Sequence, residues 1–143
     1  MFSILDFLVK HWSLTMGIVV TGLLLLREEI RSRLFSKHVL SPEDAALESR
    51  KGRIITDIRD KTDFIAEHVD GADWLKIDTL QKKPERIIKP EKSYIIYCSD
   101  GAKSSEVAMF LRQKHGFKVS CIEGGLAAWK AHGFATISGS KPA

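Results

Sequence analysis

The chain has 143 residues, of which 44% are hydrophobic and 28% charged, a length that suits one ordinary domain or a small domain with an appendage. Ten glycines and four prolines are too few for a collagen-like chain, the hydrophobic content excludes a wholly disordered one, and two cysteines exclude a disulfide-rich scaffold. The net charge of +4 is mild and is not concentrated in one block, so the sequence does not indicate a nucleic-acid partner.

The first quarter of the chain is its most apolar part. No charged residue lies between Trp12 and Leu26, but a helix over residues 12–26 rises only about 22 Å, against roughly 30 Å for the hydrocarbon core of a bilayer. If Leu8 and Val9 join it and Lys10 extends toward the headgroups, the segment predicts one transmembrane helix over about residues 8–26. The alternatives are a cleaved signal peptide, which the flanking acidic residues disfavour, and a buried helix of a soluble protein.

The charges around this segment predict its orientation and the domain boundaries. Lys10 lies near its amino-terminal end, and four basic residues follow it: Arg27, Arg31, Arg33 and Lys37. By the positive-inside rule the rest of the chain faces the cytoplasm. Three small residues spaced four apart could let this helix associate with another: Ser13, Gly17 and Thr21. We therefore expect an anchor with a basic linker over residues 1–37, one domain over 38–134 and a flexible tail over 135–143.

Strands alternate with helices after the linker. Apolar runs over 54–58, 94–97 and 119–122 predict buried strands, with shorter pieces at 39–40 and after Gly71. Ser41 followed by Pro42 is a helix start, because serine caps a helix and proline fits its first turn. Further helices are expected over 63–68, 84–89, 104–115 and 125–129. This alternation favours an α/β domain with a parallel sheet covered on both faces.

Cys98 directly follows the strand at 94–97, at the carboxyl end where ligands bind in open α/β sheets. The loop after it, residues 99–103, is small enough for its main-chain N–H groups to turn inward. These groups, the following helix and Lys103 would stabilise a thiolate, which is the nucleophilic form of cysteine. The alternative is a buried structural cysteine, and that is our interpretation of Cys121, which lies inside an apolar strand.

Three motifs in order resemble the rhodanese-like sulfurtransferases over about residues 37–134. The first motif is similar to the family's D-x-R, E-F and G-H-I-P-G-A pattern. It consists of Asp57 and Arg59, then Asp63-Phe64, then residues 68–72. The second motif, residues 98–104 (CSDGAKS), is similar to the family's C-x-x-G-x-R-S. The third, Gly124-Gly125 with Trp129, is similar to the family's G-G-x-x-x-W. The apolar amino terminus resembles the membrane-anchored single-domain bacterial members. The resemblance implies a rhodanese-like fold, with a central parallel five-stranded sheet flanked by helices, in a single-pass protein of the bacterial inner membrane.

The resemblance also implies a function and a set of site residues. Cys98 would take sulfane sulfur from a small-molecule or protein donor, such as thiosulfate, and pass it from a persulfide to a thiol acceptor. Asp57 and Arg59 would brace the loop, and no cofactor or metal is expected, since the five histidines are scattered. The loop residues that would bind the anion are Ser99, Asp100, Gly101, Ala102, Lys103 and Ser104.

Two departures from the family pattern, and two rival functions, bear on this hypothesis. Lys103 stands where arginine is frequent and lacks its bidentate fork, and Asp100 places a carboxylate beside the nucleophile. Both weaken the expectation for thiosulfate, so a persulfide donor is at least as well suited. One rival function is that of a cysteine phosphatase, which needs an arginine six residues after the cysteine. Ser104 occupies that position here, so the spacing disfavours a phosphatase. A non-enzymatic, membrane-tethered adaptor with this fold, binding a protein partner, is the other alternative.

Overall fold

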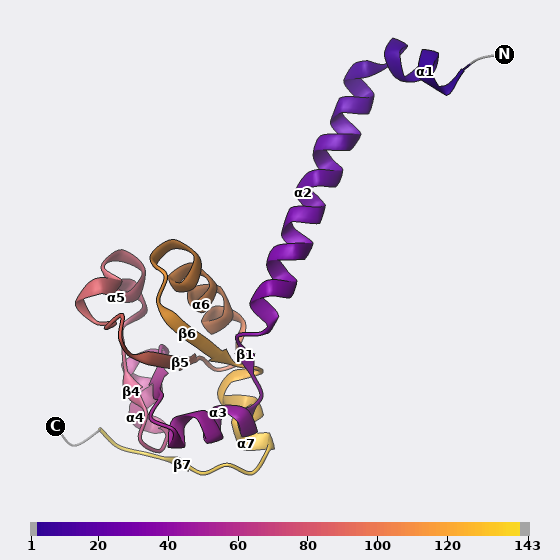
Figure 1. Ribbon diagram of the computed structural model, residues 1–143. Coiled ribbons are helices and arrows are strands. Elements are labelled where there is room, and N and C mark those ends of the chain that lie inside the picture. The colour runs from indigo at the N-terminus through magenta and orange to yellow at the C-terminus, as the bar shows by residue number, and fades with distance from the viewer. Residues whose placement is uncertain (1–2, 141–143) are drawn as a thin grey trace. The chain divides into compact units, whose positions relative to one another are not determined.

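The computed structural model describes residues 3–140 (Figure 1). The chain divides into two units, residues 1–37 and residues 38–143, and each is described by itself. The first unit holds helix α1 (Ile4–Lys10) and helix α2 (Trp12–Ser36). The second holds a mixed α/β domain.

The continuous transmembrane helix predicted over residues 8–26 is not found. Leu8 and Val9 belong to α1, and the chain leaves the helical conformation at His11 (φ −115°, ψ 37°) before α2 begins. Only residues 12–26 of α2 precede Arg27, so its uncharged part rises about 22 Å, short of a bilayer core. None of the helices formed by residues 3–140 is both long enough and apolar enough to cross a membrane.

Five strands form one parallel sheet, as predicted. Their order is β1-β6-β5-β2-β4, and every neighbouring pair is parallel. In the register of the two central strands, Ile55 of β2 lies opposite Ile95 of β5. The strands are β1 (Val39–Leu40), β2 (Ile54–Asp57), β4 (Asp73–Trp74), β5 (Ser93–Tyr97) and β6 (Lys118–Ile122).

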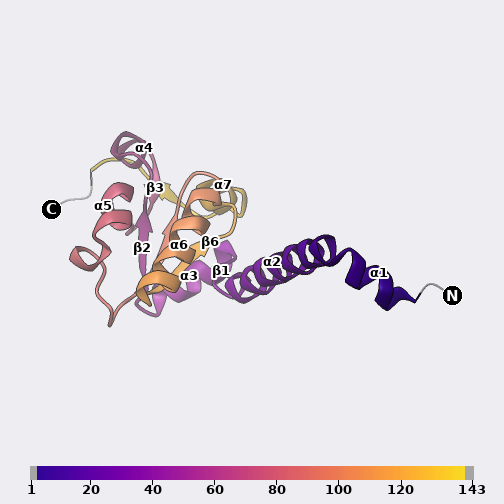
Figure 2. The same ribbon diagram turned by 90° about the horizontal axis from the view of Figure 1, so that it is seen from above.

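Helices cover both faces of the sheet. They are α3 (Pro42–Arg50), α4 (Lys61–Ala66), α5 (Ile77–Lys82), α6 (Ala102–His115) and α7 (Gly125–Ala131). Helices α5 and α6 lie on one face, and α3 and α7 on the other (Figures 1 and 2). The Ser41 hydroxyl accepts a hydrogen bond from the Asp44 N–H at 3.1 Å, which confirms the predicted cap. Helix α5 was not predicted, and the helix expected over 84–89 is only the 3-10 turn η1 (Pro84–Arg86).

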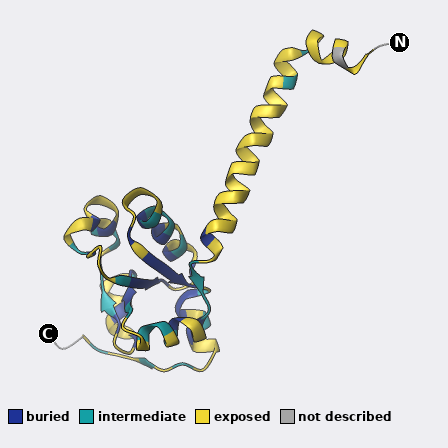
Figure 3. Ribbon diagram, in the orientation of Figure 1, coloured by how far each residue is buried: buried dark blue, intermediate teal, exposed yellow. Residues whose placement is uncertain are grey.

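The core lies on both sides of the central strands (Figure 3). Ile95 and Tyr97, which are fully buried, pack with Ala45 of α3 and with Leu126 and Trp129 of α7. Side chains alternate along a strand, so the buried Tyr94 and Ile96 point to the opposite face, where α6 lies. Because both faces of β5 are buried, its carboxyl end is rigidly placed, and Cys98 is the next residue.

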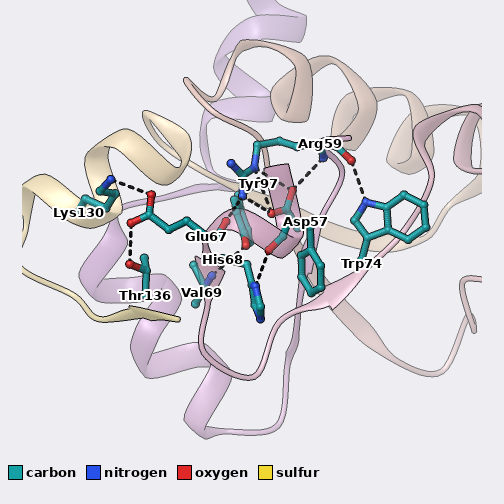
Figure 4. Close-up of polar contacts among 10 residues, drawn as sticks. Asp57, Arg59, Glu67, His68, Val69, Trp74, Tyr97, Lys130 and Thr136 are labelled. Carbon is teal, nitrogen blue, oxygen red and sulfur yellow. Dashed lines mark hydrogen bonds and ion pairs between the residues drawn. The ribbon is translucent and has the colours of Figure 1, made fainter. Parts of the chain in front are cut away.

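Part of the segment predicted as a flexible tail over residues 135–143 forms a short strand. Strand β7 (Thr136–Ile137) pairs antiparallel with β3 (His68–Val69), and the Gly139 N–H donates to the carbonyl of Ile65 at 2.8 Å. Glu67 adds two side-chain contacts, accepting hydrogen bonds from Lys130 and Thr136 at 2.8 Å each (Figure 4). Residues 141–143 of the predicted tail lie outside the described residues.

The Glu67 contacts make the stability of this C-terminal segment dependent on pH. The Lys130 ammonium, and after it the Thr136 hydroxyl, hold the pKa of Glu67 below its ordinary value. A carboxyl whose pKa is lowered by folding stabilises the fold above its unfolded pKa, and this contribution is lost as the pH falls through the folded value. Glu67→Gln should therefore be less stable than the wild type at pH 7 and approach it below about pH 4 in urea unfolding. A stability gap that is constant over that range would contradict this role.

Candidate functional site: the cysteine loop at the sheet edge

A cavity of about 360 Å³ opens at the carboxyl edge of the parallel sheet. One wall is the loop that follows β5, with Cys98, Ser99, Asp100, Ala102 and Lys103. The other wall consists of residues 58–60 after β2, Asp63 of α4 and Ile77 of α5. The volume suits a small ligand.

The Cys98 sulfur is surrounded by hydrogen-bonding groups of its own loop. The main-chain N–H groups of Gly101 and Ser104 point at Sγ, at 3.2 and 3.4 Å. As a thiol, Cys98 has two acceptors within reach: Asp100 Oδ1 at 3.6 Å and the Ser104 hydroxyl at 3.5 Å. Because two N–H dipoles converge on Sγ at the start of α6, the site stabilises negative charge on that sulfur.

A further N–H group of the loop, that of Ala102, is already hydrogen-bonded within the loop. The Ala102 N–H donates to Asp100 Oδ1 at 3.0 Å. This bond, and after it the contact with the Cys98 thiol, holds the pKa of Asp100 below its ordinary value. The loop therefore keeps a carboxylate ionised beside its cysteine.

Helix α7 fixes the shape of the loop from behind. The N–H groups of Leu126 and Ala127 donate to the carbonyls of Cys98 and Ser99, at 2.8 and 3.1 Å. Gly125 has a positive φ of 59°, and a Cβ there would overlap the Cys98 carbonyl oxygen and lie 2.7 Å from the Gly101 nitrogen. The Gly124-Gly125 pair thus lets the backbone of α7 lie directly against the cysteine loop.

A buried ion pair supports the opposite wall of the cavity (Figure 4). Asp57 is fully buried, and the Arg59 guanidinium donates to both of its oxygens, the shortest bond being 2.7 Å. A further guanidinium bond reaches the Glu67 carbonyl, and the Trp74 indole N–H donates to the Arg59 carbonyl at 2.8 Å. Arg59 thereby holds three segments together where it lines the cavity.

The second cysteine differs from Cys98 in its surroundings. Cys121 is 1% exposed inside β6, and burial raises the pKa of its thiol to about 11. Both cysteines are free thiols. A thiol in such an apolar setting stays protonated at neutral pH and is a poor nucleophile.

The structure brings the sequence-predicted site residues to one place, with distinct positions. Gly101 and Ser104 contact Sγ, Asp100 both contacts Sγ and lines the cavity, and Ser99, Ala102 and Lys103 line the cavity beside it. Sequence reasoning did not assign Ile58, Asp60, Asp63 or Ile77 to the site, and it named Gly125 only as part of a family motif. Asp63 was visible as part of a motif, but nothing in the sequence places α4 and α5 opposite the cysteine.

Comparison with known proteins agrees with this geometry. The family model described as "Rhodanese-like domain" matches residues 41–132. Thiosulfate sulfurtransferase GlpE of Coxiella burnetii is 35% identical over 97 residues, which is 67% of this chain and 89% of that protein.

Solved structures share the same fold. A rhodanese-related protein of Thermoplasma volcanium superposes with a TM-score of 0.62 at 24% identity, over 70% of this chain and 97% of that one. The Alr3790 protein of Anabaena superposes with a TM-score of 0.60 at 27% identity, over 69% of this chain and 81% of that one. Most of the second unit is thus shared with proteins that carry this domain, and two curated relatives, at 35% and 37% identity, are named thiosulfate sulfurtransferase. The chain therefore belongs to the rhodanese-like domain family, and at the level of that family it is a sulfurtransferase-type enzyme.

Proposed function

We propose that this protein transfers sulfane sulfur through a persulfide formed on Cys98. The observation that carries the proposal is the position of Sγ, which accepts two main-chain N–H bonds beside a cavity of small-molecule size. These dipoles stabilise the negative charge on Sγ in the thiolate that attacks the donor. Relatives named thiosulfate sulfurtransferase support the same reaction type.

The transfer proceeds in two displacements. The Cys98 thiolate attacks the outer sulfur of the donor, an Sγ–S bond forms, and the donor's S–S bond breaks. The electron pair of that bond leaves with the rest of the donor, as sulfite from thiosulfate or as a thiolate from a persulfide. An acceptor thiolate then attacks the outer sulfur of the Cys98 persulfide and restores the Cys98 thiolate, so no external oxidant or reductant is required.

The two cysteines provide a matched test. After incubation of the 143-residue chain with thiosulfate or with an alkyl persulfide, the protein mass should increase by about 32 Da, one sulfur atom. Cys98→Ser should lose this gain completely, and Cys121→Ser should retain it, because the Cys121 thiol is buried and protonated. Whole-protein mass spectrometry, before and after treatment with a reducing thiol, measures both.

The same experiment separates the proposed enzyme from a binding module. A sulfur gain that persists in Cys98→Ser, or that maps to Cys121, would place the chemistry elsewhere. A chain that gains no sulfur from any donor would instead be a non-enzymatic adaptor that uses the fold to bind a partner.

A further inference from the structure

Asp100 occupies part of the anion-binding loop with its own carboxylate. Its Oδ1 accepts the Ala102 N–H at 3.0 Å and lies 3.6 Å from Cys98 Sγ. One N–H donor of the loop is therefore already bonded to a side chain of the same loop. An incoming anionic group would lie close to the negative charge of the Asp100 carboxylate. The occupied N–H group and the carboxylate charge therefore weaken the binding of an anionic donor, in addition to any effect on the cysteine.

The opposite wall of the cavity adds to this negative charge. Asp60 and Asp63 are exposed carboxylates that line the same cavity. Of the two basic residues lining it, Arg59 is already paired with the buried Asp57. Among the described residues that line the cavity, Lys103 is thus the one basic side chain not paired with Asp57. Three carboxylates line the same cavity: Asp60, Asp63 and Asp100. A cavity with this balance repels a dianion more strongly than a donor with one charge or none.

We propose that the sulfur donor of this site is a persulfide with at most one negative charge, and that Asp100 selects against dianionic donors such as thiosulfate. This inference rests on the proposed persulfide chemistry of Cys98. Asp100 acts as a specificity-determining residue, because its carboxylate already accepts the Ala102 N–H. The non-reacting end of a bound anion would have to compete with that carboxylate for the same hydrogen bond.

The loading step with such a donor balances without a further reactant. The Cys98 thiolate attacks the outer sulfur of R–S–SH, the Cys98 Sγ–S bond forms, and the S–S bond of the donor breaks, with its electron pair leaving on R–S⁻. The departing thiolate carries one charge, whereas thiosulfate would release a sulfite dianion into the same acidic cavity.

The test compares two donors on three variants of the 143-residue chain. The donors are thiosulfate and the persulfide of 2-mercaptoethanol, and the readout is kcat/KM for loading sulfur onto Cys98. Asp100→Asn removes the charge but keeps an oxygen that can accept the Ala102 N–H, and Asp100→Ala removes both. Asp70→Asn, an exposed carboxylate in the turn after β3, is the matched control.

Wild type is expected to load from the persulfide faster than from thiosulfate. Asp100→Asn should raise the thiosulfate rate about tenfold relative to the persulfide rate, since a like charge a few ångströms away changes an ionic equilibrium by about that factor. Asp100→Ala should raise it at least as much, and Asp70→Asn should leave the ratio unchanged. Raising the salt concentration from about 0.05 to about 0.5 M should also raise the thiosulfate rate relative to the persulfide rate in the wild type, because salt screens the repulsion. The increase should be smaller in Asp100→Asn.

The failure of this inference can be distinguished from the failure of the proposed function. If Cys98 loads from the persulfide but the donor ratio is the same in the wild type and in both Asp100 variants, Asp100 does not select the donor, and the inference is overturned. A wild type that prefers thiosulfate overturns it as well. If neither donor loads Cys98, the proposed function itself is wrong and the inference is lost with it.

Discussion

Replacing Gly125 by alanine is expected to lower the free energy of unfolding by about 3 kcal/mol and to abolish loading of sulfur onto Cys98. The added Cβ would overlap the Cys98 carbonyl oxygen and approach the nitrogens of Gly101 and Asp100 to 2.7 and 3.0 Å. All three are backbone atoms, so the clash cannot be relieved by a rotamer change and must displace the loop. Urea unfolding measures the stability, and the mass gain of the protein measures the loading.

Gly116→Ala is the matched control for backbone strain. Gly116 has a similar positive φ of 70° at the end of α6, but a Cβ there meets no atom within 4 Å. Its substitution should cost about 1 kcal/mol, the strain of a left-handed alanine, with full loading of Cys98. If the two variants were equally stable and equally active, the close approach of α7 to the cysteine loop would not matter for the site.

Much of the fold was predictable from local signals. The apolar runs around Ile55, Ile95 and Val119 predict three central strands because a strand buried on both faces needs continuous apolar residues. The resemblance then implied the five-stranded parallel sheet that the structure shows. The cysteine loop was recognisable because its residues are contiguous, and contiguous residues stay together in any fold.

What depends on contacts between distant segments was not predictable. The pairing of β7 with β3 joins residues almost 70 positions apart through only two residues on each strand, too few for a periodic pattern. The break at His11 follows from no proline or glycine, so hydropathy alone joined Leu8 to Leu26. That Asp100 takes the Ala102 N–H depends on the exact turn of the loop, although the sequence did place a carboxylate beside the cysteine.

Arg59→Ala is expected to lower the free energy of unfolding by about 3–5 kcal/mol, the usual cost of leaving a buried charge without its partner. Asp57 is fully buried, and the Arg59 side chain is only 10% exposed. After truncation the Asp57 carboxylate would keep the main-chain N–H of residue 59, at 2.8 Å, but lose both guanidinium donors. The bond from the guanidinium to the Glu67 carbonyl would be lost as well. Urea unfolding at pH 7 measures the loss.

Burial, and not the mere presence of an ion pair, is the reason for this large effect, and Lys51→Ala tests that reason. The Lys51–Glu48 pair has nearly the same separation, 2.8 Å against 2.7 Å, but the Lys51 side chain is 69% exposed. Water screens such a pair, so its loss should cost less than about 1 kcal/mol. In Asp57→Asn/Arg59→Met both charges are gone, and the double variant should be destabilised by less than the sum of its two single variants. Additive effects of the two substitutions, or equal costs for Arg59→Ala and Lys51→Ala, would show that the pair does not act as a buried unit beneath the cavity wall.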